Sequence, residues 1–238
     1  MIGGGSLRST DIDKIIKAVK ESYSFTTISQ DRENAIRLAL SHVGDGAYDM
    51  NHHGHGYLYA KCNGHDCKIT DCSGWVSYIF LCANETNPRL SGVLATDGLS
   101  SGQPIWKDFN KYGWTTSQYG WWAVKPADAI IHFSGKTASE DTSHTGAHHA
   151  LLYIGMLSAE KYPDGLELSN GQIMQPQQPI TVECLTLNGK GNIYLTNCWN
   201  TGESFGADQF PTYASGSSTN KYVLHPDNIL FIRPFDPN

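Results

Sequence analysis

The stretch Asp71-Cys72-Ser73-Gly74-Trp75-Val76 opens a run of mostly apolar residues that continues to about residue 83. The apolar spacing predicts a helix over 71–83, with Asp71 as its N-cap. Cys72 then lies in the first turn, where free backbone N–H groups and the helix dipole stabilise a thiolate. The same N–H groups suit an oxyanion, and the small Ser73 and Gly74 leave the approach to the sulfur open. The pattern indicates a cysteine nucleophile; the alternatives are a core cysteine or half of a disulfide.

A histidine at the start of a predicted strand is the candidate base for this cysteine. His149 begins the apolar run 149–155, in which it shares a strand face with Leu151 and Tyr153. A histidine held there takes up the thiol proton and returns it to the leaving amine. The spacing leaves His144 and His148 open as rivals, and a hydrogen-bonded structural histidine is the alternative interpretation.

A catalytic imidazole needs its second ring nitrogen fixed by another polar group. The strand-like run 192–200 contains Asn197 and Asn200, although asparagine is depleted in strands. We predict Asn197 as the orienting residue. The alternative is that both asparagines only end the strand and begin a turn.

Helix signals come early in the chain and strand signals come late. Helical spacing follows Ser9, and again follows Ser29 as a predicted N-cap, with Gly44 ending the second helix. Apolar, strand-like runs follow at 127–133, 149–155, 180–187, 192–198 and 229–233. This order predicts an α+β fold with N-terminal helices packed on a central antiparallel sheet. We expect residues 1–30 to form a linker and helix, and residues 31–238 the catalytic domain.

Composition narrows the class of function. Of 238 residues, 39% are hydrophobic and 17% charged, with 24 glycines, which fits a loop-rich globular chain. The formal net charge of −6 and the lack of a Lys/Arg run argue against a nucleic-acid partner. No apolar run reaches the roughly 18 residues of a membrane span. Residues 1–6 do not resemble a signal peptide, so any export signal is expected to have been removed or to lie on a longer parent chain. Six cysteines leave the redox compartment open.

Possible metal ligands lie between the helix predicted after Ser29 and the helix predicted over 71–83. Zinc-ligand residue types crowd the segment 52–67, but no standard zinc motif matches. A zinc-bound loop, a Cys62–Cys67 disulfide and plain loop residues therefore all stay open. A metal there would hold the loop together rather than perform chemistry, and we predict no cofactor for the reaction.

These motifs together resemble those of the NlpC-type cell-wall endopeptidases, which belong to the papain-like superfamily. The nucleophile motif matches at 71–74, and the base motif, a histidine before a short strand ending Tyr-x-Gly, matches at His149, Tyr153 and Gly155. The turn 125–128 matches the family's Pro-Gly-Asp-like turn, with Ala in place of Gly. Tyr48 matches a family tyrosine near the cleft, which implies an oxyanion or substrate contact. The resemblance covers residues 31 to 233 and is specific only at the cysteine and histidine motifs.

The sequence departs from the family pattern in three places. The third catalytic position, commonly histidine, falls on Asn197. An insertion lies between Tyr48 and Cys72, and the span from Cys72 to His149 is longer than usual. Aromatic residues in that span either stack on sugar or peptide or simply pack the insertion. They are Trp106, Tyr112, Trp114, Tyr119, Trp121 and Trp122. We predict Trp122 as a substrate contact.

The resemblance implies a papain-like fold and hydrolysis of a D-glutamyl linkage to a diamino acid in peptidoglycan stem peptides, through an acyl-enzyme. Cys72 attacks, His149 moves the proton, and the Cys72 N–H with Tyr48 stabilises the oxyanion, beside Asp71 and Ser73. We expect a monomer that is extracellular, wall-bound or associated with a phage virion. The residues alone indicate only a thiol hydrolase. The alternatives are an amidase that separates sugar from stem peptide, a non-catalytic wall-binding or phage-tail module, and a zinc-dependent hydrolase.

Overall fold

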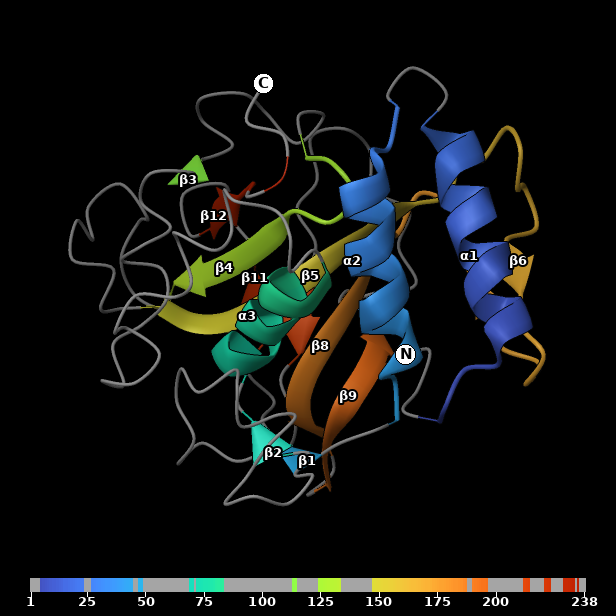
Figure 1. The fold of residues 1–238 in the computed structure, drawn as a ribbon. Helices are drawn as coiled ribbons and strands as arrows, with labels where there is room; N and C mark the ends of the chain where they lie inside the picture. Colours follow the sequence, from blue (N-terminus) through green and yellow to red (C-terminus); the bar gives the residue numbers. More distant parts are fainter. Residues whose placement is uncertain are drawn as a thin grey trace.

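The chain folds as a mixed α+β protein with helices packed on an antiparallel sheet (Figure 1). The computed structural model describes residues 5–23, 27–44, 47–48, 69–70, 72–83, 113–114, 124–133, 147–187, 190–196, 212–214, 221–223, 229–233 and 235. The predicted α+β class and the antiparallel sheet are confirmed.

The described residues form three helices, all of them early in the chain: α1 (Ser9–Ser22), α2 (Gln30–Ser41) and α3 (Cys72–Ala83). Ser29 is the N-cap of α2, as predicted, and its hydroxyl accepts a hydrogen bond from the Arg32 backbone N–H at 3.4 Å. Gly44 follows the end of α2 with φ +87°, a left-handed conformation that glycine adopts without steric cost. Helix α3 begins at Cys72, as predicted. Asp71, its predicted N-cap, lies outside the described residues.

The central sheet has six strands in the order β3-β12-β4-β5-β8-β9, and all neighbouring pairs are antiparallel. Five of its strands match the five predicted runs: β4 (Ala129–Phe133), β5 (Ala147–Met156), β8 (Pro179–Leu187), β9 (Lys190–Thr196) and β12 (Ile229–Ile232). The sixth, β3 (Gly113–Trp114), has only two residues and shows no period in the sequence.

Three small pairs of strands accompany the central sheet. β1 (Ala47–Tyr48) and β2 (Ile69–Thr70) are parallel, whereas β6 (Leu166–Glu167) with β7 (Ile173–Met174), and β10 (Thr212–Ala214) with β11 (Lys221–Val223), are antiparallel. Such short strands carry too few residues for an alternating pattern.

The sheet has one face toward the helices, which we call the helix face. On β5 it is formed by Ala150, Leu152 and Ile154, which belong to the same buried core as the apolar residues of all three helices. The registers of the neighbouring strands continue this face: Leu152 pairs with Val182 of β8, and Val182 pairs with Leu195 of β9. The five strand side chains named here are at most 1% exposed.

The opposite face, the second face, is also buried around the middle of β5. Leu151 and Tyr153 of β5 are 1% and 3% exposed but lie outside the helix-face core. Leu151 pairs with Ile130, which pairs with the equally buried Phe231. Because both faces are apolar, β5 reads as a continuous hydrophobic run rather than an alternating one.

Helix α1 is attached to the last residues of β5 and to the segment that follows them. The Tyr23 and Tyr153 hydroxyls are 2.5 Å apart, and the Ser158 N–H donates to the Ser22 hydroxyl at 2.9 Å. Val19 packs closely on Gly155, because a Cβ added at Gly155 would lie 2.7 Å from Val19 Cγ1. Helix α1 is therefore part of the same core as the sheet, while the predicted domain division at residue 30 stays a prediction.

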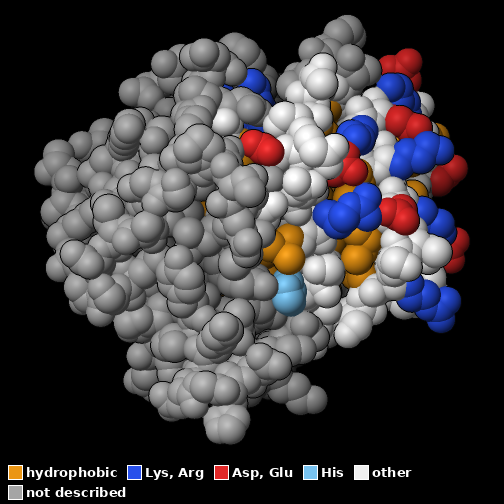
Figure 2. All heavy atoms as spheres, in the orientation of Figure 1, with side chains coloured by type: hydrophobic (Ala, Val, Ile, Leu, Met, Phe, Trp, Pro, Cys, Tyr) orange, Lys and Arg blue, Asp and Glu red, His pale blue; other side chains and the backbone are white. Residues whose placement is uncertain are grey.

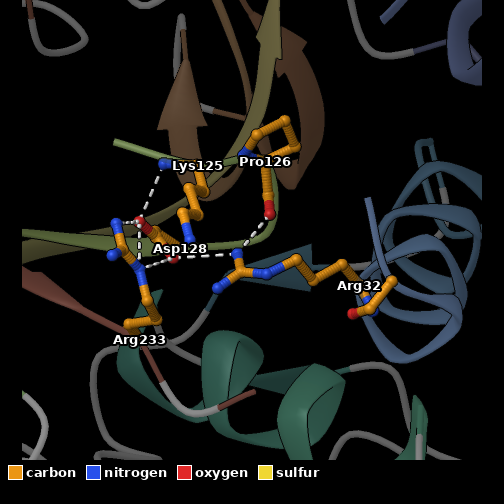
Figure 3. A network of polar contacts seen from close by, with 6 residues as sticks. Arg32, Lys125, Pro126, Asp128 and Arg233 are labelled. Atoms are coloured by element: carbon orange, nitrogen blue, oxygen red, sulfur yellow. Dashed lines mark hydrogen bonds and ion pairs between the residues drawn. The ribbon is translucent and has the colours of Figure 1, made fainter. Parts of the chain in front are cut away.

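A buried ion network joins α2 to the sheet (Figure 3). Asp128 is fully buried and accepts from Arg32 Nη1 at 2.9 Å and from Arg233 Nη2 at 2.7 Å. Arg32 Nη1 also donates to the Pro126 carbonyl at 2.6 Å, and the Lys125 N–H donates to Asp128 Oδ2 at 2.9 Å. The turn 125–128 thus holds α2, β4 and the residue after β12 together.

The exposed sides of α1 and α2 carry charges of both signs (Figure 2). Several of these charges pair on the surface: Lys17 with Glu21, Lys20 with Glu33, and Arg37 with Asp13 and Glu33. Within the ranges given above, no helix has both the length and the hydropathy needed to cross a membrane.

Candidate functional site

Cys72 is the first residue of α3, as the sequence predicts. Its thiol is not in a disulfide, and the residue is 7% exposed, so the disulfide interpretation is excluded. Backbone N–H groups in the first turn of a helix have no partner within the helix, and the dipole adds positive potential there. The first turn of α3 therefore offers backbone N–H donors at the point where attack by the sulfur would form an oxyanion.

The residues after Cys72 fix α3 on the sheet. Trp75, Ile79 and Phe80 are fully buried in the core, and the indole of Trp75 meets the His42 ring edge-on, with centroids 5.8 Å apart. Figure 1 shows α3 lying over the sheet, where it contacts β5 and β8. The start of α3 is thus held by a rigid apolar anchor. The side chain of Ser73 lies outside the description.

The backbone of Tyr48 lies next to the segment that leads into Cys72. Tyr48 pairs with Thr70 in the parallel β1–β2 pair, and Thr70 is two residues before Cys72. This register places the backbone of Tyr48 beside a residue two positions before Cys72 in the chain. The predicted metal ligands of 52–67 lie outside the described residues.

The predicted base lies on β5, but the register raises a question about its face. Positions 149–152 pair in step with 132–129, and Leu151 lies on the second face. The side chain of His149 lies outside the description, so its role as the base stays a prediction. A register shift follows at once, because Phe133 pairs with Ala147 and position 148 has no partner in this ladder. The sequence could not reveal this, since both faces of β5 are apolar.

The register places the end of β9, the strand that precedes Asn197, the predicted orienting residue. Thr196, the last residue of β9, pairs with Thr181, which pairs with Tyr153. Tyr153 is four residues beyond His149, about 13 Å along the strand at the usual rise. Asn197 follows Thr196 and lies outside the described residues, as do Asn200 and Trp122.

A buried carboxylate that the sequence analysis missed lies on the second face. Glu183 is fully buried, and its Oε1 accepts from the Thr181 hydroxyl at 3.0 Å and from the Thr196 hydroxyl. The two hydroxyls are 2.7 Å apart. A charged residue in the middle of the apolar run 180–187 was the available signal, because burying a carboxylate is costly unless polar groups surround it.

Among the residues that the structure describes, no group of three or more His, Cys, Asp or Glu could hold a metal ion. Comparisons of the chain with protein-family models, with curated proteins and with solved structures gave no match.

Proposed function

We propose that this chain is a cysteine hydrolase of papain-like fold that cuts an amide bond in peptidoglycan stem peptides. The observation that carries the proposal is a free Cys72 at the first residue of a twelve-residue helix packed on an antiparallel sheet. This arrangement supplies a sulfur nucleophile and backbone donors at the point where an oxyanion forms. The wall-peptide substrate comes from the resemblance of the cysteine and histidine motifs to the NlpC-type enzymes.

The mechanism has two steps. The Cys72 thiolate attacks the amide carbonyl carbon. The resulting oxyanion accepts hydrogen bonds from the Cys72 backbone N–H and the Tyr48 hydroxyl. A histidine at the amino end of β5, for which the sequence predicts His149, gives the thiol proton to the leaving amine as the C–N bond breaks. The same imidazole then takes a proton from water, which attacks the acyl-enzyme and releases the carboxylic acid and the free thiol.

Purified cell walls and defined muropeptides test the proposal. We expect the wild-type chain to release stem-peptide fragments, and Cys72→Ala to release none. Cys184→Ala is the matched control, because Cys184 is the other buried cysteine among the described residues that is not in a disulfide. It should stay active. Cleavage retained by Cys72→Ala overturns the mechanism.

Mass spectrometry of the products separates the related activities. New amino termini on the diamino acid support the endopeptidase, whereas freed lactyl groups indicate the amidase that separates sugar from peptide. Wall binding without cleavage, together with a Cys72 that iodoacetamide fails to alkylate at neutral pH, identifies a non-catalytic module. Inhibition by a chelator but not by alkylation identifies a zinc-dependent hydrolase.

A further inference from the structure

We draw no further inference here: the strongest candidate, the buried cluster of the Glu183 carboxylate with the Thr181 and Thr196 hydroxyls on the second face of β8 and β9, carries nothing, because no part of the chain that the structure describes shows what covers it.

Discussion

Neutralising Asp128 should unfold this protein far more easily than neutralising a surface carboxylate. Asp128 is fully buried between Arg32, which is 1% exposed, and Arg233 (Figure 3). In Asp128→Asn the shape of the side chain is kept, but the buried Arg32 and the neighbouring Arg233 lose the carboxylate with which both form ion pairs. Removing one partner of a buried pair typically costs about 3–5 kcal/mol.

A loss of that size is a large part of the total stability. Domains are stable by about 5–15 kcal/mol, and for a chain of this length each kcal/mol moves Tm by about 2–4 °C. We therefore expect Asp128→Asn to lower Tm by about 6–20 °C. Urea unfolding followed by tryptophan fluorescence measures the free energy of unfolding directly.

Asp13→Asn is the matched control. Asp13 pairs with Arg37, but the two side chains are 63% and 47% exposed, and such surface pairs contribute about 0–1 kcal/mol. Replacing Arg32 by Met in the Asp128→Asn background should recover part of the loss, because it removes the buried charge that has lost its carboxylate. If Asp128→Asn and Asp13→Asn unfold at the same urea concentration, the reasoning is refuted.

Two further predictions concern the attachment of α1. Gly155→Ala should destabilise the fold by about 1–3 kcal/mol, because φ is +148° and the new Cβ would lie 2.7 Å from Val19 Cγ1; Val19→Ala in the same chain should restore part of the stability, and a neutral Gly155→Ala would contradict the close packing. For Asp11, burial raises the pKa, but hydrogen bonds from Ser169 outweigh it, so the pKa lies below its ordinary value of 3.8. A carboxyl group whose pKa is lowered by folding stabilises the folded state at pH values above its unfolded-state pKa. This contribution is lost as the pH falls through the folded-state pKa. The stability difference between wild type and Asp11→Asn should therefore be full at neutral pH and shrink below about pH 3.8, and a difference that stays constant down to pH 2 would contradict it.

Local signals in the sequence predict the framework of the fold well. The serine at position 29 caps a helix because its hydroxyl reaches the third N–H of that helix, a contact that depends only on neighbouring residues. The five long strands each carry an apolar run, and Cys72 begins its helix where the apolar spacing begins. These elements need no knowledge of distant parts of the chain.

The arrangement of the site depends on long-range contacts, which the sequence does not display. The pairing of Tyr48 with Thr70 joins segments separated by an insertion, and two-residue strands have no period. The face of His149 depends on which side of β5 meets α3, and both sides are equally apolar. The level of Thr196 relative to Tyr153 depends on the register of three strands, which no local pattern predicts.

The parallel pairing of β1 and β2 has a consequence for how this chain can vary. The chain leaves one strand at Tyr48 and enters the other at Ile69, and neighbouring strands are held about 4.8 Å apart. Parallel strands cannot be joined by a tight hairpin, so some connecting length is obligatory. Beyond that minimum, each doubling of a flexible connection costs only about 0.6 kcal/mol. The connection can therefore be exchanged for another of different length and chemistry while the approach to the thiol keeps its shape.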